Sequence, residues 1–176
     1  MTSSRIETRD MVIAAFCTAV IAVCSQITVP MPGGVPVTLQ TFAVALCGFL
    51  LAPKLAAASV TVYLLLGAVG VPVFAGFSGG ASALFGVTGG FLWGFLALAV
   101  LGALSRKKLP SLGLSLAGLV ICHLAGVLQY MLLSHMGFVE AAMLVSLPFL
   151  LKDIVSVVLA LLLSLRLRPL LHPAEK

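Results

Sequence analysis

The chain has 176 residues, of which 61% are hydrophobic and 9% are charged, with a mean hydropathy of +1.24 and a formal net charge of +5. A soluble domain usually carries about 25% charged residues, so this composition excludes a water-soluble globule. The basic residues form short clusters between apolar runs rather than one basic surface, which excludes nucleic acid as the reason for the positive charge. The composition predicts an all-α membrane protein with a single domain over residues 1–176.

Apolar runs separated by charged or Gly/Pro-rich breaks predict six transmembrane helices, because in lipid every backbone N–H and C=O needs a partner within the protein. The helices are expected at about 11–29, 37–52, 54–70, 87–104, 111–134 and 148–168. The first run has no A-x-A cleavage signature, so we interpret it as an uncleaved helix rather than a signal peptide. The second and third runs are short, so we expect them to tilt or to end against protein rather than lipid.

The distribution of Lys and Arg predicts the orientation. If both termini are cytoplasmic, nine of the ten basic residues lie inside, in agreement with the positive-inside rule. These residues are Arg5, Arg9, Lys54, Arg106, Lys107, Lys108, Arg166, Arg168 and Lys176. The exception is Lys152. This topology places the segments 30–36, 70–86 and 135–147 outside, and we expect all three to be loops.

The stretch PFLLKDIV places Lys152 and Asp153 at the head of the last predicted helix. Counting back from Arg166 at about 1.5 Å per residue puts the pair about 20 Å from the inner end, which is about 10 Å below the outer surface. Ionisable groups at that depth are costly and usually face a cavity. Adjacent helical residues do not face each other, so we expect each to have a separate partner. The alternative is a snorkelling pair that marks the end of the helix.

Other polar and aromatic side chains are expected near the same outer half of the protein. They are Thr38, Gln40, Thr41, Tyr63, Phe74, Phe77, Ser78, Thr88, Phe91, Trp93, Gln129 and Tyr130. Together with Lys152 and Asp153 they predict an outward-facing, mostly apolar pocket with a few convergent polar groups, which is how small-molecule sites are usually built. For Tyr63, which lies deeper, the alternative is core packing with a hydrogen-bonded hydroxyl. The four cysteines lie inside apolar runs and are interpreted as small buried hydrophobes.

Four stretches carry a resemblance to a known family. They are VPVTLQTFAVALCGFLLAPK (35–54), YLLLGAVGVPVFAGFSGG (63–80), VTGGFLWGF (87–95) and PFLLKDIVSVVLA (148–160). They resemble the BioY family, the biotin-binding membrane subunits (S components) of energy-coupling-factor (ECF) transporters. The resemblance implies a multi-pass protein of a bacterial or archaeal cytoplasmic membrane that captures biotin outside and delivers it inward. It implies a transmembrane coupling subunit and two ATPase subunits as partners, no chemistry on biotin, and no cofactor.

The resemblance also implies roles for individual residues. The block Thr38 to Thr41 would close over biotin as a lid, and the glycine-rich segment 76–90 would bring backbone close to it. Asp153 matches the acidic residue of the family, and a carboxylate can accept hydrogen bonds from the ureido N–H groups of biotin. The predicted ligand-binding residues are Gln40, Thr41, Tyr63, Phe74, Ser78, Gly79, Gly80, Gln129, Tyr130, Lys152 and Asp153.

Two positions depart from the family pattern. Ser156 stands where the family commonly has a lysine three residues after the aspartate, so Lys152 is assigned to the ureido carbonyl or the carboxylate of biotin from a different angle. Val87 replaces the proline usual in a G-P-T-G-G loop, which predicts a looser turn.

Ala15 and Ala19 lie four residues apart on the first predicted helix, a spacing that lets helices approach closely in lipid. In S components an A-x-x-x-A motif on the first helix docks the coupling subunit, so the resemblance assigns these residues to that contact. The alternative is ordinary packing within the chain.

Two other classes of function remain as alternatives. Ser78 lies in a G-x-S-G pattern and His123 in a later helix, the combination that an intramembrane serine protease uses, because an alcohol nucleophile needs an adjacent base. We interpret His123 instead as a neutral, hydrogen-bonded core residue. A self-sufficient carrier usually has internal repeats, and none is found here. The sequence has no P-loop, so ATP hydrolysis would depend on other subunits.

Overall fold

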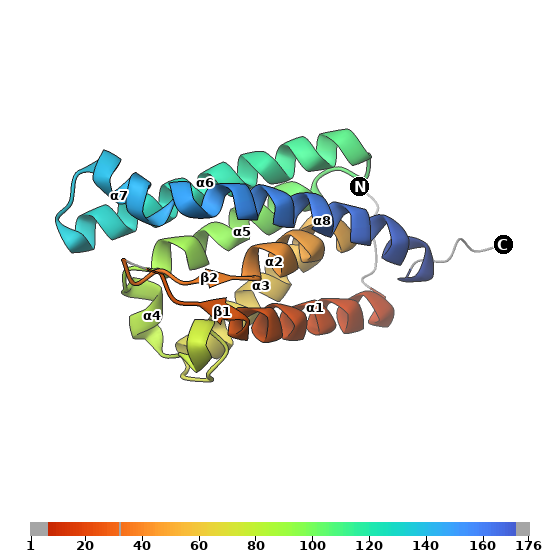
Figure 1. The fold of residues 1–176 in the computed structure, drawn as a ribbon. Helices are drawn as coiled ribbons and strands as arrows, with labels where there is room; N and C mark the ends of the chain where they lie inside the picture. The colour runs from red at the N-terminus through yellow and green to blue at the C-terminus, as the bar shows by residue number, and fades with distance from the viewer. Residues whose placement is uncertain (1–6, 32, 172–176) are drawn as a thin grey trace.

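The computed structural model describes residues 7–31 and 33–171, which form a bundle of helices with one short hairpin (Figure 1). The elements in chain order are α1 (Thr8–Gln26), β1 (Thr28–Val29), β2 (Val37–Thr38), α2 (Gln40–Leu50), α3 (Pro53–Ala68), the 3-10 turn η1 (Ala75–Phe77), α4 (Ala81–Phe85), α5 (Gly89–Ala103), α6 (Lys108–Ser134), α7 (Phe138–Val145) and α8 (Leu147–Leu171). The topology argument from Arg5 and Lys176 rests on residues outside the described ranges.

Three helices, α1, α6 and α8, are long and apolar enough to cross a membrane. The helices α2, α3 and α5 are apolar but shorter, with 11, 16 and 15 residues. At about 1.5 Å per residue, α2 is roughly 16 Å long, about half of a hydrocarbon core of roughly 30 Å. The chain is therefore a helical, multi-pass membrane protein, while the number of six spans stays a prediction.

Each predicted run overlaps one of the six longest described helices, but several boundaries and two loops are wrong. The first helix ends at Gln26, and the second begins at Gln40 because residues 37–38 pair with β1 in an antiparallel hairpin. The segment 70–86 contains η1 and α4, and the segment 135–147 contains α7. The helix α7 forms because its apolar face packs against α6 and α8.

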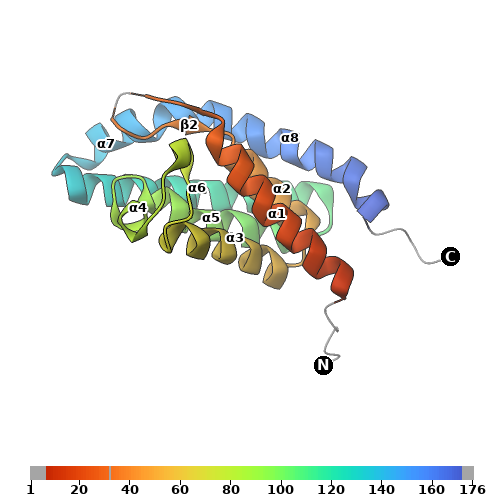
Figure 2. The same cartoon turned by 90° about the horizontal axis from the view of Figure 1, so that it is seen from below.

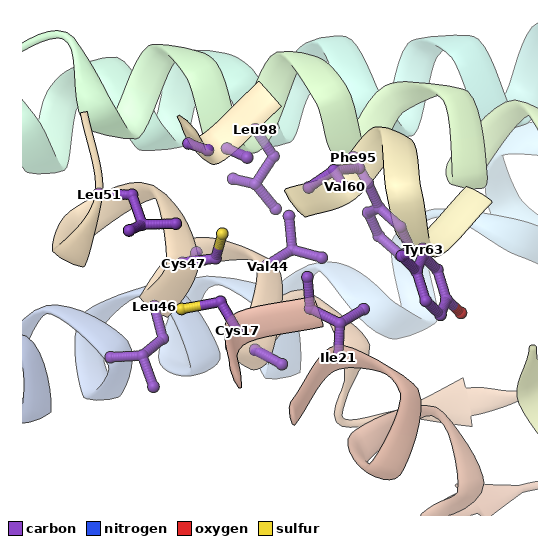
Figure 3. Packing of buried hydrophobic residues seen from close by; sticks show 14 of the residues in the cluster. Cys17, Ile21, Val44, Leu46, Cys47, Leu51, Val60, Tyr63, Phe95 and Leu98 are labelled. Atoms are coloured by element: carbon purple, nitrogen blue, oxygen red, sulfur yellow. The ribbon is translucent and has the colours of Figure 1, made fainter. Parts of the chain in front are cut away.

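The helix α2 lies at the centre of the bundle. All of its residues except Phe42 are buried, as expected for a helix that is apolar on every side. Figure 3 shows Val44 of α2 between Ile21 of α1 and Leu98 of α5, and each of these side chains has no exposed surface. The ends of α2 are therefore shielded by protein rather than lipid, one of the two arrangements expected for a short run.

Two arginines bind the carboxyl end of α2. Arg168 at the end of α8 donates from Nε to the carbonyl oxygen of Phe49 at 2.8 Å, and Arg106 donates from Nη1 to that of Leu50 at 3.4 Å. Arg168 also donates from Nη1 to the carbonyl of Arg106 at 3.2 Å. The last carbonyls of a helix have no partner within it, so these bonds satisfy groups that lipid could not.

The helices α5 and α6 pack backbone against backbone through glycines. A Cβ on Gly94 of α5 would lie 2.5 Å from Cα of Cys122, and a Cβ on Gly118 of α6 would lie 2.8 Å from Cα of Leu98. No side chain fits at such distances, and small residues allow this close approach in membranes. We call this contact between α5 and α6 at Gly94 and Gly118 the α5–α6 seam, and it joins the two helices into one rigid pair.

The two ends of the bundle differ. Figure 1 and Figure 2 show that α1 begins and α8 ends at the same end, while the hairpin, α4 and α7 gather at the opposite end. The arginines that bind α2 lie toward the first end, and the irregular segments form the second.

We predict that Gly94→Ala lowers the stability of the protein by about 1–3 kcal/mol, because the added methyl group overpacks the α5–α6 seam. Thermal unfolding of the detergent-solubilised protein, followed by circular dichroism, measures the effect. The matched control is Gly113→Ala on α6, since Gly113 is exposed and a Cβ there meets nothing within 4 Å. That control should be neutral or stabilising by up to about 1 kcal/mol. Equal effects at both positions would contradict a close seam.

Candidate functional site

A partly open cavity of about 270 Å³ lies at the end of the bundle that carries the hairpin. This volume is near the lower end of small-molecule sites, about 300–1,000 Å³. The cavity is formed by the segment before β2, the hairpin, α2, the η1–α4 region, α5, α6 and α8. Its lining residues are Gly34, Val35, Pro36, Thr38, Gln40, Thr41, Phe74, Ala75, Ser78, Ala83, Thr88, Phe91, Leu92, Phe95, Leu119, Cys122, His123, Phe149, Lys152 and Asp153.

Lys152 and Asp153 line this cavity from the second turn of α8. Asp153 is only 6% exposed, so the alternative of a snorkelling pair at the helix end is wrong for the carboxylate. Lys152 Nζ forms an ion pair with Asp153 Oδ1 and donates to the carbonyl oxygen of Thr38 at 2.9 Å. Each residue therefore has a separate partner, as expected, but the argument that adjacent residues do not face each other is wrong for this pair. The long, flexible lysine stem lets its ammonium turn back toward the adjacent carboxylate while still reaching β2.

His123 is the second partner of Asp153. Its Nε2 lies 3.3 Å from Asp153 Oδ2, and its Nδ1 lies 2.8 Å from Ser146 Oγ at the junction of α7 and α8. The prediction of a buried, hydrogen-bonded residue is confirmed for His123, but its place in the cavity lining was missed. A signal existed in the sequence, because a histidine in the middle of an apolar membrane helix is itself an indication of function.

The two carboxylate oxygens of Asp153 differ in their contacts: Oδ2 faces His123 and Oδ1 faces Lys152. Within residues 7–31 and 33–171, the buried Oδ1 lacks a hydrogen bond of regular geometry, although the Lys152 ammonium forms an ion pair with it and the Thr41 hydroxyl lies near the carboxylate. Buried polar atoms are rarely left in this state without a reason. A ligand N–H in the cavity is the kind of donor that this oxygen would accept.

Polar groups at the start of α2 form a chain that leads away from the cavity. Thr38 Oγ1 donates to Gln40 Oε1 at 3.0 Å, and Gln40 Nε2 donates to the hydroxyl oxygen of Tyr63 at 2.5 Å. The Tyr63 ring is fully buried and meets Phe74 edge to face, with centroids 5.4 Å apart. Tyr63 thus stands behind Gln40 and fixes its amide, whereas Gln40 itself lines the cavity.

The structure brings together six of the predicted ligand-binding residues. Those in the lining are Gln40, Thr41, Phe74, Ser78, Lys152 and Asp153. Those outside it are Tyr63, Gly79, Gly80, Gln129 and Tyr130.

Three of the residues outside the lining have other contacts. Gln129 Nε2 donates to the carbonyls of Leu84 and Gly86, at 3.1 and 2.6 Å, and so holds the connection between α4 and α5. Tyr130 packs in a separate apolar cluster beneath the hairpin. Gly79 lies against the backbone of the segment after α3, where a Cβ would be 2.6 Å from the carbonyl oxygen of Val71.

The serine of the protease alternative does not meet its base. Ser78 Oγ donates to the carbonyl oxygen of Ala75 at 2.9 Å, while both ring nitrogens of His123 face Ser146 and Asp153. The geometry therefore does not form the dyad that serine chemistry needs.

Comparison with known proteins identifies the family. The sequence model of the BioY family matches residues 1–173. The chain belongs to the BioY family. It is 40% identical to a probable biotin transporter BioY of Pyrococcus horikoshii, over 92% of this chain and 98% of the relative. It is 41% identical to the biotin transporter BioY of Thermotoga maritima, over 92% of this chain and 97% of the relative.

A solved structure shares this BioY fold. The crystal structure of the S component for biotin from an ECF-type ABC transporter superposes with a TM-score of 0.84 at 26% identity, covering 96% of this chain and 94% of that chain. The resemblance seen in the sequence is thus confirmed, and the protein is a member of a transporter family rather than an enzyme.

We predict that Tyr63→Phe destabilises the protein by about 1–2 kcal/mol, because Gln40 Nε2 loses its buried acceptor. Thermal unfolding of the purified protein measures the change. The control is Tyr130→Phe, since the Tyr130 hydroxyl makes no hydrogen bond to any residue in the described ranges. If the two variants unfold alike, the Gln40–Tyr63 bond does not contribute to stability.

Proposed function

We propose that this protein is the biotin-binding subunit of an ECF-type vitamin transporter, which captures biotin on the outer side and delivers it inward without altering it. The observation that carries the proposal is Asp153, a buried carboxylate that lines a cavity of about 270 Å³ and whose Oδ1 lacks a hydrogen bond of regular geometry from the described residues. Membership of the BioY family and the biotin-related names of its relatives support the choice of ligand.

The chemistry of the cavity suits a ureido ring. One N–H group of such a ring can donate to Asp153, and charge-assisted bonds of this kind are roughly twice as strong as neutral ones. The ammonium of Lys152 can donate to the ureido carbonyl or the carboxylate of biotin, in addition to its bond to Thr38. Gln40 and Thr41 close the cavity from α2, and apolar residues of α5 and α6, such as Phe95 and Leu119, face the hydrocarbon part of the ligand.

Asp153→Asn should weaken biotin binding about tenfold to a hundredfold, because the amide carries no charge and one of its two sites donates instead of accepting. Titration of the detergent-solubilised protein with labelled biotin measures the dissociation constant. Asp10→Asn, in the first turn of α1 and outside the cavity lining, is the matched control and should bind as the wild type does. Wild-type affinity in the Asp153→Asn protein would refute the assignment of this site.

We also propose that the chain crosses the cytoplasmic membrane of a bacterium or archaeon six times with both termini inside. In support, α1 begins and α8 ends at one end of the bundle, where Arg106 and Arg168 lie, and the cavity is at the other end. Basic residues favour the cytoplasmic side. The cavity would then open outward.

Transport in this proposal needs a transmembrane coupling subunit and two ATPase subunits, since the sequence has no P-loop of its own. Ala15 and Ala19 are the proposed contact with the coupling subunit. Both are exposed on α1, whereas Ala14 and Thr18 are buried, so packing within the chain does not occupy the first two positions. Exposed small residues at this spacing allow another helix to approach closely in lipid.

Replacing both Ala15 and Ala19 by Leu should leave biotin affinity unchanged but prevent assembly and uptake, because the larger side chains keep a partner helix at a distance. Co-purification with the coupling subunit and uptake of labelled biotin in cells measure the two effects. Ala58→Leu, an exposed alanine on α3, serves as the control for added bulk. Normal assembly of the double variant would contradict docking at this position.

A further inference from the structure

We infer that His123 is a positioning residue for Asp153, held as the neutral tautomer with its proton on Nε2. In this arrangement His123 holds Oδ2 of the carboxylate, so that Oδ1, on the side of Lys152, is the oxygen left to accept from a ligand. The identity of that ligand as biotin rests on the proposed function, whereas the orientation of Asp153 rests on the contacts of His123.

The contacts of the ring define the proton positions. Asp153 Oδ2, 3.3 Å from His123 Nε2, can only accept when the carboxylate is ionised, so Nε2 must carry the hydrogen. In the neutral ring Nδ1 is then an acceptor, and the Ser146 hydroxyl at 2.8 Å donates to it. The result is a directed chain in which Ser146 donates to His123 and His123 donates to Asp153.

The charge balance of the cavity favours the neutral ring. Among the described lining residues, the charged side chains are Lys152 and Asp153, whose charges cancel as an ion pair. The other described residues with a contact to the ring are uncharged: Phe91 from α5 and Ser146 before α8. A protonated His123 would place two cations on one carboxylate and give the buried site a net positive charge, which is costly.

Packing also fixes the plane of the ring. Phe91 meets the imidazole edge to face, with ring centroids 5.8 Å apart and planes at 89°. His123 itself is only 6% exposed. A ring held by an aromatic side chain and by two hydrogen bonds has little freedom, so it can hold the carboxylate in one rotation. The hydrogen bond between Nδ1 and Ser146 thus sets the state of Nε2, and Nε2 orients the carboxylate of Asp153.

Nuclear magnetic resonance of protein labelled with ¹⁵N in the histidine rings tests the tautomer. The chain has three histidines, so the His123→Gln variant assigns the His123 signals by subtraction. At neutral pH we expect a protonated Nε2 and an unprotonated Nδ1, told apart by their couplings to the ring hydrogens. Ser146→Ala should shift the Nδ1 signal most. A protonated Nδ1, with or without a proton on Nε2, would overturn the inference.

Binding measurements test the effect on the ligand site. His123→Gln keeps an N–H that can reach Asp153, so biotin affinity should stay within about threefold of wild type. His123→Leu has no donor and should weaken binding about tenfold to a hundredfold. A purely structural role would affect both variants alike, and that outcome, or wild-type affinity in His123→Leu, would overturn the inference.

The control is His135→Asn. His135 is exposed at the end of α6 in the left-handed conformation, with φ of 55°, which asparagine tolerates, so biotin affinity should not change. If the wild-type protein does not bind biotin, the proposed function fails. The ¹⁵N measurement needs no biotin, so it tests the contact between His123 and Asp153 whether or not the protein binds biotin.

Discussion

The arrangement of the whole bundle depends on the need of α2 for hydrogen-bond partners in the absence of water. This helix is too short to span the hydrocarbon core, so both of its ends must be satisfied by protein. At the carboxyl end Arg106 and Arg168 bind the last carbonyls. At the amino end Gln40 and Thr41 become part of the cavity lining. One buried helix therefore joins the basic end of the bundle to the candidate site, with α1, α5 and α8 packed around it.

The candidate site follows the same constraint, that buried polar groups need partners within the protein. Lys152, Asp153, His123 and Ser146 form one connected set, and each member has a partner on a different segment of the chain. A connected set of this kind is stabilised in a low-dielectric interior, where hydrogen bonds and ion pairs are electrostatically stronger than in water. The seam between α5 and α6 supports it, since the rigid pair holds His123 and Phe91 in fixed relation.

Long apolar runs made the six main helices predictable from the sequence, and the depth of Asp153 in the last run made that residue a predictable part of the site. The hairpin was not predictable, because two residues per strand give no period-2 pattern. The helices α4 and α7 are short, with 5 and 8 residues, and α4 lies in a glycine-rich segment. The position of His123 in an apolar helix was a signal of function, but its pairing with Asp153 was hidden, because that pairing depends on how α6 and α8 face each other.

The parts of the candidate site lie far apart in the sequence, which affects the order in which the protein folds during synthesis. The bond from Lys152 to the carbonyl of Thr38 joins residues separated by 114 positions, and the cavity draws on segments from Gly34 to Asp153. The α5–α6 pair, in contrast, is a local hairpin of helices. Local contacts form early in folding and distant ones late. The α5–α6 pair can therefore assemble while synthesis continues, whereas the site is completed only when α8, the last helix to be inserted, packs against α2.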